Sequence, residues 1–344
     1  MPEPDVQNEK IVPVEKRPFL SVVCPIYNEE EGTEALMDMF LEVLSELEQT
    51  FELIIVDDGS ADQTLAKAKS AIGRITNLRV VELYRNYGQI AAIGAGMSVA
   101  RGEWIVMLDG DLQHDPKDIT RLLREIASGH DLVATYRERR EETRLRLFIT
   151  WCMNRVNRYA TGVKIRDFGS GYRLFNANLL DMITDQHGYV YYNTPALYIY
   201  ARSVVEVPIT QSRRAHGSSK WTIDAFILFN LDFFLHSKKA TQILFTAGIF
   251  GIFSGVFLYT ISLLGITEAR SISAPITIAF TSFLVILLGI VWREVLRTQR
   301  FALGLPPFII RSIWCAGADG KPVSETEPRL RNGRVIPEAH LKRN

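Results

Sequence analysis

The stretch Leu108-Asp109-Gly110-Asp111-Leu112-Gln113-His114 directly follows the apolar run Trp104 to Leu108, which is typical of a short buried strand. Two carboxylates separated by one residue at a strand end can bind one hard divalent cation, which bridges the phosphates of a nucleoside diphosphate. An Asp-x-Asp triplet is common, and it usually marks a solvated turn or a helix cap. Its position after a hydrophobic strand makes Asp109 and Asp111 candidate metal ligands.

Similar apolar, β-branched runs occur on both sides of this stretch and alternate with longer helical segments. Between the first two runs, apolar residues from Leu36 to Leu47 follow the i, i+3, i+4 spacing of a buried helix face. This alternation predicts an α/β fold with a mostly parallel sheet and a ligand crevice at the carboxyl ends of its strands. The runs are Phe19 to Pro25, Phe51 to Val56, Leu78 to Leu83, Trp104 to Leu108, Asp131 to Thr135 and Val204 to Ile209.

Polar residues also follow the first two predicted strands. The first strand leads into Pro25-Ile26-Tyr27-Asn28-Glu29, and the second leads into Asp57-Asp58-Gly59-Ser60. A carboxylate here can accept a hydrogen bond from a base N–H, while the glycine and serine form the turn into the next helix. Helix capping accounts for one of the two aspartates but not easily for both.

Composition excludes several classes of protein. Lys and Arg number 39, as do Asp and Glu, so a polybasic nucleic-acid binder is not favoured and no nucleic acid is expected as a partner. Cys24, Cys152 and Cys315 lie far apart, which predicts neither a disulfide framework nor a zinc site. The first 18 residues have no apolar core of a secretory signal, so we expect the N-terminus in the cytosol.

Two uncharged stretches in the C-terminal third, Ala240 to Thr267 and Ser271 to Trp292, predict a transmembrane hairpin. Each exceeds the roughly 20 residues that cross a bilayer; buried core helices, the alternative, seldom stay uncharged for so long. Two spans in the cell (inner) membrane, with both termini cytoplasmic, follow from the flanking charges. These are Lys238 and Lys239 before the first span and Arg293, Arg297 and Arg300 after the second, against Arg270 in the turn.

Taken in order, the motifs resemble the family-2, or A-type, inverting glycosyltransferases, and among them the polyisoprenyl-phosphate glycosyltransferases such as dolichyl-phosphate mannose synthase. The resemblance covers Phe19 to Arg300. It rests on Pro25 to Glu29, Asp57 to Ser60, Asn86-Tyr87-Gly88-Gln89, Asp109 to His114, Asp167 to Phe175, and Arg214-x-x-Gly217-x-Ser219-Lys220.

This resemblance implies a GT-A (Rossmann-like) catalytic domain and a role for each matching residue. Asp167 falls where the family places its candidate base, and orienting the sugar or acceptor is the alternative role. Catalytic roles fall to Asp111 and Asp167, and ligation of Mg²⁺ or Mn²⁺ falls to Asp109, Asp111 and Gln113. Nucleotide-sugar binding falls to Pro25, Tyr27, Asn28, Glu29, Asp58, Gln89 and Asp109, and acceptor-phosphate binding to Arg137, Arg214, Ser219 and Lys220.

A basic stretch from Arg137 to Arg166 and the loop Arg213 to Lys220 indicate where a lipid phosphate would bind. For any single arginine a solvated helix face is the more ordinary explanation, but as a group the cations suit an anionic membrane and an acceptor phosphate. The expected division is a flexible segment 1–18, a catalytic domain 19–220, an interfacial amphipathic helix 221–239, two transmembrane helices 240–293 and a cytoplasmic tail 294–344. The helix 221–239 packing on the catalytic domain is an equal alternative.

The hairpin is similar to that of the bacterial glucosyl-lipid subgroup. The resemblance therefore implies inverting transfer of glucose from UDP-glucose to a polyprenyl phosphate such as undecaprenyl phosphate, for envelope or O-antigen glycosylation. Mannose from GDP-mannose and modified arabinose from UDP are the alternative donors, and a non-catalytic membrane protein that binds nucleotide-sugars is an alternative of another class. The sequence leaves the oligomeric state open, although a small hairpin anchored by its neighbours would favour a homo-oligomer such as a tetramer.

Overall fold

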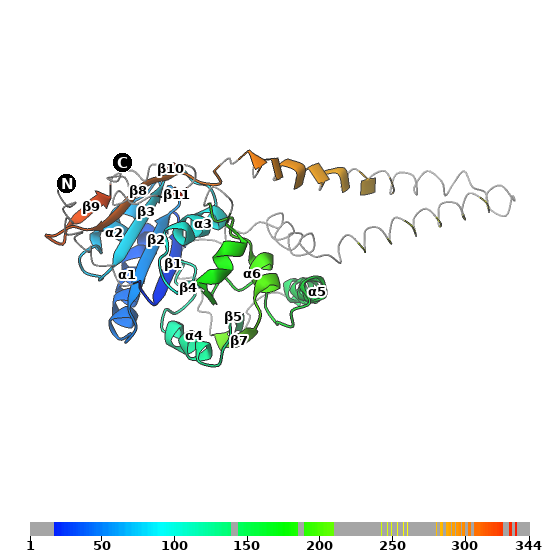
Figure 1. Ribbon diagram of the computed structural model, residues 1–344, viewed down its shortest axis with the longest axis horizontal. Coiled ribbons are helices and arrows are strands. Elements are labelled where there is room, and N and C mark those ends of the chain that lie inside the picture. The colour runs from blue at the N-terminus through cyan, green and yellow to red at the C-terminus, as the bar shows by residue number, and fades with distance from the viewer. Residues whose placement is uncertain are drawn as a thin grey trace, which may run out of the picture.

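One nine-stranded sheet organises the chain, with the strand order β7-β5-β6-β4-β1-β2-β3-β8-β9 (Figure 1). The computed structural model describes residues 17–138, 144–184, 189–209, 306–325, 330–331 and 334–335, together with separate positions between residues 242 and 303.

The centre of the sheet is parallel, as the sequence predicts. Strand β1 lies between β2 and β4, and β2 in turn pairs with β3. These strands are buried along almost their whole length, which explains their continuous apolar, β-branched sequences. Their bounds are Leu20–Ile26 for β1, Phe51–Asp57 for β2, Leu78–Leu83 for β3 and Trp104–Met107 for β4.

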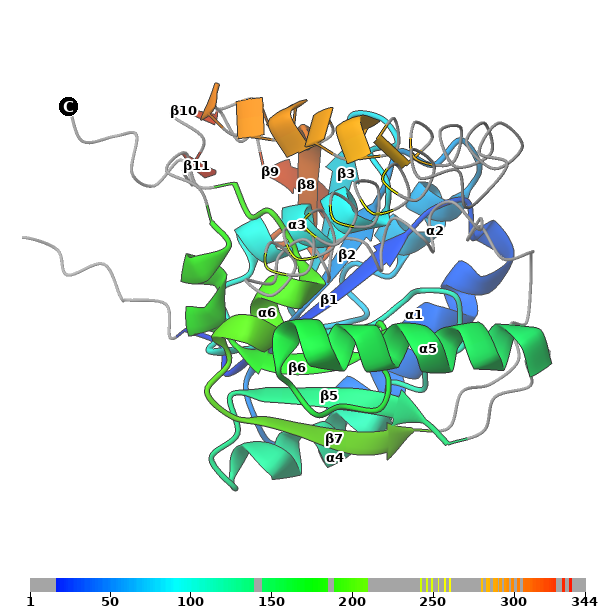
Figure 2. The same cartoon turned by 90° about the vertical axis from the view of Figure 1, so that its right-hand side faces the viewer.

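A strand that the sequence patterns did not predict joins the two halves of the sheet. Strand β6 (Arg173–Asn176) runs antiparallel between β4 and β5 (Leu132–Arg137), and β7 (Val204–Ile209) pairs in parallel with β5. Figure 2 shows β5, β6 and β7 side by side. The sheet is therefore mostly parallel, with antiparallel strands inserted.

Helices cover both faces of the sheet. Side chains of α1, α2 and α4 form one hydrophobic core, and those of α3 and α6 belong to the other. The bounds are Glu30–Ser45 for α1, Thr64–Ser70 for α2, Gln89–Val99 for α3, Asp118–Ile126 for α4, Arg144–Thr161 for α5, Ala177–Met182 for the 3-10 helix η1 and Thr194–Tyr200 for α6.

Two strands from the predicted tail extend the same sheet. Strand β8 (Ile310–Ala316) pairs antiparallel with β3, and β9 (Pro322–Glu325) pairs with β8. The indole N–H of Trp314 donates to Glu82 Oε2 at 3.0 Å, which ties β8 to β3. Strands β10 (Leu330–Arg331) and β11 (Arg334–Val335) form a separate antiparallel pair.

Several predictions concern residues outside the described part of the chain. These are the predicted interfacial helix at 221–239, most of the predicted spans at 240–293, and the acceptor candidates Arg214, Ser219 and Lys220. Among the described residues, no helix combines the length and the apolar character needed to cross a membrane. The hairpin stays a prediction.

Candidate active site

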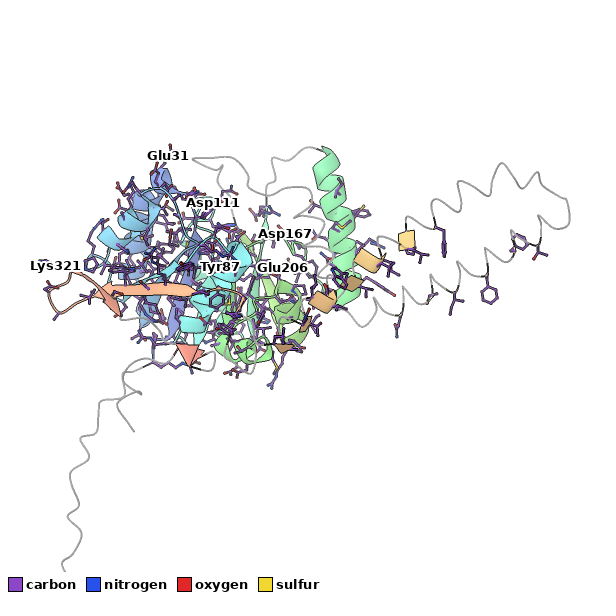
Figure 3. All side chains as sticks on the ribbon, turned by 90° about the horizontal axis from the view of Figure 1, so that it is seen from above. Glu31, Tyr87, Asp111, Asp167, Glu206 and Lys321 are labelled. Atoms are coloured by element: carbon purple, nitrogen blue, oxygen red, sulfur yellow. The ribbon has the colours of Figure 1, made fainter. Side chains whose placement is uncertain are left out.

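Asp109 and Asp111 lie in the loop after β4, against the end of β1. A Cβ added to Gly110 would come within 2.6 Å of Ile26 Cγ2 and 2.9 Å of the Pro25 carbonyl oxygen. Only glycine allows so close an approach, so Gly110 sets the path of the backbone between the two carboxylates. Figure 3 shows Asp111 on the same side of the domain as Asp167.

The carboxylate of Asp109 is held from several directions. Gln89 Nε2 donates to Asp109 Oδ1 at 2.6 Å, and His114 Nε2 lies 4.0 Å from Oδ2. Burial raises the pKa of Asp109, and the charge of Asp111 adds to the rise, while His114, Arg173 and Gln89 oppose it. A divalent cation bound beside the two carboxylates would favour the ionised form of Asp109.

The loops after β1 and β2 are fastened to each other and to the start of α3. Asp58 accepts the backbone N–H groups of Tyr87 at 2.8 Å and Gly88 at 2.9 Å. Asn28 Oδ1 accepts the N–H of Ala61 at 2.9 Å. Asp58 thus fixes the loop that delivers Gln89 to Asp109, a supporting contact that the motif alone does not reveal.

The remaining donor-side candidates lie at the same edge of the sheet. Pro25 is buried within β1, and Tyr27 and Glu29 are partly buried in the loop before α1. The backbone N–H of Gln113 donates to Asp111 Oδ1 at 3.2 Å, which places Gln113 beside the carboxylate pair. The structure therefore brings together the donor-side residues predicted from three separate motifs.

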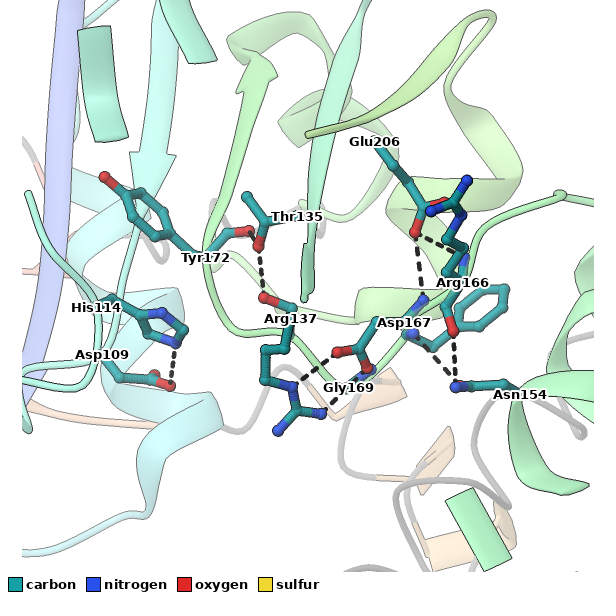
Figure 4. A network of polar contacts seen from close by, with 12 residues as sticks. Asp109, His114, Thr135, Arg137, Asn154, Arg166, Asp167, Gly169, Tyr172 and Glu206 are labelled. Atoms are coloured by element: carbon teal, nitrogen blue, oxygen red, sulfur yellow. Dashed lines mark hydrogen bonds and ion pairs between the residues drawn. The ribbon is translucent and has the colours of Figure 1, made fainter. Parts of the chain in front are cut away.

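Arg137 and Asp167 form a two-point ion pair on the other side of the site (Figure 4). Arg137 Nε donates to Asp167 Oδ2 at 2.8 Å, and an Nη atom donates to Oδ1 at 3.2 Å. The Asp167 side chain is 1% exposed and that of Arg137 17%. The sequence predicts separate roles for Asp167, as candidate base, and for Arg137, as phosphate ligand, and does not predict their contact.

Residues from two other elements hold the backbone beside Asp167. Glu206 Oε1 on β7 accepts the N–H groups of Arg166 at 2.6 Å and Asp167 at 3.2 Å. Asn154 Nδ2 on α5 donates to the Arg166 carbonyl at 2.8 Å, as Figure 4 shows. Neither support is predictable from the sequence, since neither Glu206 nor Asn154 belongs to a recognisable motif.

A cavity of about 340 Å³ opens beside this ion pair. Three cations of the basic stretch line it, together with a face of α5 on which side chains recur every four residues. That spacing, at residues 150, 154 and 158, is the one sequence signal that could have identified the cavity. The lining residues are Tyr136, Arg137, Glu138, Thr150, Trp151, Asn154, Arg158, Arg166 and Asp167.

Glu206 leads to a prediction about stability and pH. Burial raises the pKa of Glu206, although the N–H groups of Arg166 and Asp167 oppose the rise. A raised pKa means that burying the ionised carboxylate destabilises the fold. This loss of stability is complete above the folded-state pKa, decreases as the pH falls, and is absent below the unfolded-state pKa. We expect Glu206→Gln, whose amide oxygen can accept both N–H groups, to be up to about 1 kcal/mol more stable at neutral pH.

Thermal unfolding of the full chain in detergent measures this effect. The advantage of Glu206→Gln should fade as the pH falls below about 4, where the parent carboxyl becomes protonated in both states. A variant that is less stable than the parent protein at neutral pH would contradict the assignment.

Similarity to known proteins identifies the family of this chain. The Glycosyl transferase family 2 profile matches residues 21–184. Dodecaprenyl-phosphate galacturonate synthase of Rhizobium johnstonii is 36% identical over 222 residues, which cover 62% of this chain and 64% of that protein. This chain therefore spans slightly less than two thirds of that relative. Undecaprenyl-phosphate 4-deoxy-4-formamido-L-arabinose transferase of an Enterobacter species is 32% identical over 246 residues, covering 71% of this chain and 75% of that protein.

A solved structure similar to the chain is glucosyl-3-phosphoglycerate synthase of Mycobacterium tuberculosis in complex with Mn²⁺, UDP-glucose and phosphoglyceric acid. It is 20% identical, covers 62% of this chain and 76% of that one, and has a TM-score of 0.46. The family assignment rests on the sequence matches. The chain belongs to glycosyl transferase family 2, and its α/β domain has the GT-A-like fold that the motifs predict.

Proposed function

We propose that the chain transfers a sugar from a nucleotide-sugar to the phosphate of a polyprenyl lipid. The observation that carries this proposal is the arrangement of two charged sites at one edge of the sheet. Asp109 and Asp111 form the acidic site, and the cavity lined by Arg137, Arg158 and Arg166 forms the basic one. A cation-bound diphosphate suits the first, and a lipid phosphate suits the second.

On the donor side, Asp109, Asp111 and Gln113 would hold Mg²⁺ or Mn²⁺, which neutralises charge on the departing nucleoside diphosphate. Oxygen ligands are those that such hard cations prefer. Among the described residues, no group of three or more His, Cys, Asp and Glu side chains is placed to hold an ion.

On the acceptor side, the guanidinium of Arg137 would bind the lipid phosphate, and Asp167 would orient that guanidinium. A phosphate monoester has its second pKa near 6, so it is already ionised at neutral pH and needs no strong base. The two-point pair supports the orienting role for Asp167 over proton abstraction, because its carboxylate is occupied by Arg137. Arg214, Ser219 and Lys220 remain proposed phosphate ligands.

The proposed reaction is a single in-line displacement. A phosphate oxygen of the lipid forms a bond to the anomeric carbon as the bond from that carbon to the nucleoside diphosphate breaks. One displacement inverts the configuration, so an α-linked donor gives a β-linked product. Holding both reactants in line and stabilising the leaving group's charge lower most of the barrier.

The proposed donor is UDP-glucose, the proposed acceptor is undecaprenyl phosphate, and the proposed location is the cell membrane with two spans and a cytoplasmic catalytic domain. The relatives named for galacturonate and 4-deoxy-4-formamido-L-arabinose make those sugars the second candidates. A homo-oligomer such as a tetramer is proposed from the small hairpin.

A donor panel tests this function on the purified full chain in detergent. Labelled UDP-glucose, UDP-galacturonate, UDP-4-deoxy-4-formamido-L-arabinose and GDP-mannose are each incubated with undecaprenyl phosphate and Mn²⁺. We expect label in the organic phase only when lipid phosphate and cation are both present. Donor binding without any labelled lipid would instead indicate a non-catalytic binding protein.

Gly171 gives a prediction specific to the donor side. A Cβ added there would lie 2.6 Å from Asp109 Oδ2, closer than real contacts allow, so the carboxylate must shift. We expect Gly171→Ala to raise the Mn²⁺ concentration needed for UDP binding by about tenfold, the usual effect of displacing a ligand's support. In the control Gly169→Ala, the added Cβ meets nothing nearer than 3.4 Å. Equal Mn²⁺ requirements in both variants would refute the predicted shift.

A further inference from the structure

Arg173 is a buried cation between the donor and acceptor sides of the site. It begins β6, where its Cα is the ladder partner of Met107 on β4 and Ala134 on β5. Only 2% of the residue is exposed. Strand β4 leads to the donor carboxylates and β5 ends at Arg137, so Arg173 is placed between the two strands that carry the reacting groups.

Within the described part of the chain, the hydrogen-bond partners of this guanidinium are all uncharged groups. They are Tyr192 Oη at 2.7 Å, Tyr198 Oη at 3.0 Å, the Phe168 carbonyl at 3.0 Å and Thr194 Oγ1 at 3.4 Å. A buried charge is costly unless it is hydrogen-bonded, so these four contacts hold the guanidinium in place. The hydrogen bond to the Phe168 carbonyl acts on the loop that carries Asp167.

The loop from Asp167 to Tyr172 spans the distance between the two sides. Asp167 pairs with Arg137 at one end, and Gly171 lies against Asp109 at the other. The Tyr172 carbonyl accepts the hydroxyl of Thr135 at 2.9 Å. By binding the Phe168 carbonyl from the far end of this loop, Arg173 closes it into a fixed turn.

We propose that Arg173 is a positioning residue for sugar transfer: it fixes the loop 167–172 so that the acceptor phosphate at Arg137 lines up with the donor at Asp109 and Asp111. The proposal rests on the proposed function. When this loop moves, the phosphate oxygen loses its alignment and water attacks the anomeric carbon instead. The water oxygen then bonds to that carbon as the bond to the diphosphate breaks, which yields free sugar, nucleoside diphosphate and a proton.

The ratio of donor hydrolysis to lipid transfer tests this proposal. The ratio does not depend on how much of the enzyme is folded, so a purely structural role would leave it unchanged. The assay uses the full chain, undecaprenyl phosphate and the labelled donor that gives most lipid product in the panel above. A misalignment of about 1 Å can cost on the order of 100-fold in rate, so we expect Arg173→Lys to raise the ratio at least about tenfold.

Two further variants keep the test decisive. Tyr192→Phe is nearly isosteric and removes one acceptor, so it should raise the ratio in the same direction even where Arg173→Lys does not fold. Arg79→Lys is the matched control, since Arg79 is a largely buried cation on β3 that binds the Val99 carbonyl at 2.8 Å and pairs with Glu52. It should lose stability but keep the parent ratio.

The outcomes separate the two proposals. A parent ratio in both Arg173→Lys and Tyr192→Phe overturns the positioning role and makes Arg173 a structural cation only. An equal rise in Arg79→Lys also overturns it, because the effect would then follow from general loosening. If the parent enzyme forms no labelled lipid with any donor, the proposed function itself fails, and the positioning role falls with it.

Discussion

Asp111→Ala should lose on the order of a thousandfold or more in kcat/KM, because stabilising the leaving diphosphate through a bound cation is worth several kcal/mol. The loss follows from the geometry of the acidic site. Asp111 follows β4 beside Asp109, and the two carboxylates act on each other electrostatically. Removing one leaves a site that binds Mn²⁺ with UDP weakly, and isothermal titration of the full chain in detergent measures that affinity.

The control for Asp111 lies in the same loop. Asp115 Oδ1 accepts the backbone N–H of Lys117 at 2.9 Å, a local turn contact before α4 that asparagine can also make. Asp115→Asn should therefore keep the parent turnover and Mn²⁺ dependence. An Asp111→Ala enzyme with normal activity would refute the metal assignment.

Breaking the Arg137–Asp167 ion pair should give the second large effect, a loss of kcat/KM for the acceptor lipid. We expect Asp167→Asn to lower kcat/KM for undecaprenyl phosphate by on the order of 100-fold, with the KM for the donor little changed, because the guanidinium loses its orientation. Arg137→Gln should cost at least as much. Since the two side chains act as a unit, the double variant should be little worse than Arg137→Gln alone.

An exposed ion pair supplies the control cycle. Arg74 and Asp38 lie 2.7 Å apart, with side chains 54% and 63% exposed, and they belong to the α1 and α2 side of the domain. Arg74→Gln and Asp38→Asn should leave acceptor kinetics unchanged. Full turnover in Asp167→Asn would exclude both the orienting role and the role of general base. If the loss in the double variant equalled the sum of the two single losses in free energy, Arg137 and Asp167 would not act as a unit.

The fold could be predicted where a buried strand has a continuous apolar sequence. Strands β1 to β4 are apolar and buried, so their sequences reveal them, and the predicted runs coincide with the observed strands within one or two residues. Strand β6 escaped prediction because it is short and begins with the charged Arg173. Strand β8 escaped because its sequence shows neither a continuous apolar run nor a regular alternation, and it lies in a segment rich in proline and glycine.

Contacts within the site were predictable only where the residues adjoin in sequence. Asp109 and Asp111 form a local motif at a strand end, and the structure places them at the carboxyl edge as expected. Arg137 and Asp167 are 30 residues apart, so their pairing depends on how β5 and the loop before β6 come together. The hydrogen bonds by which Glu206 holds the backbone beside Asp167 depend on the pairing of β7 with β5, and no local sequence pattern predicts that pairing.

Identification of both reaction products tests the central claim most directly. The full chain is incubated with the active donor, undecaprenyl phosphate and Mn²⁺, and mass spectrometry identifies the lipid and the released nucleotide. We predict undecaprenyl phosphate that carries one sugar and one phosphate, formed in equal amount with the nucleoside diphosphate. A lipid with two phosphates and release of the nucleoside monophosphate would contradict the account, because the sugar phosphate, not the sugar, would have been transferred.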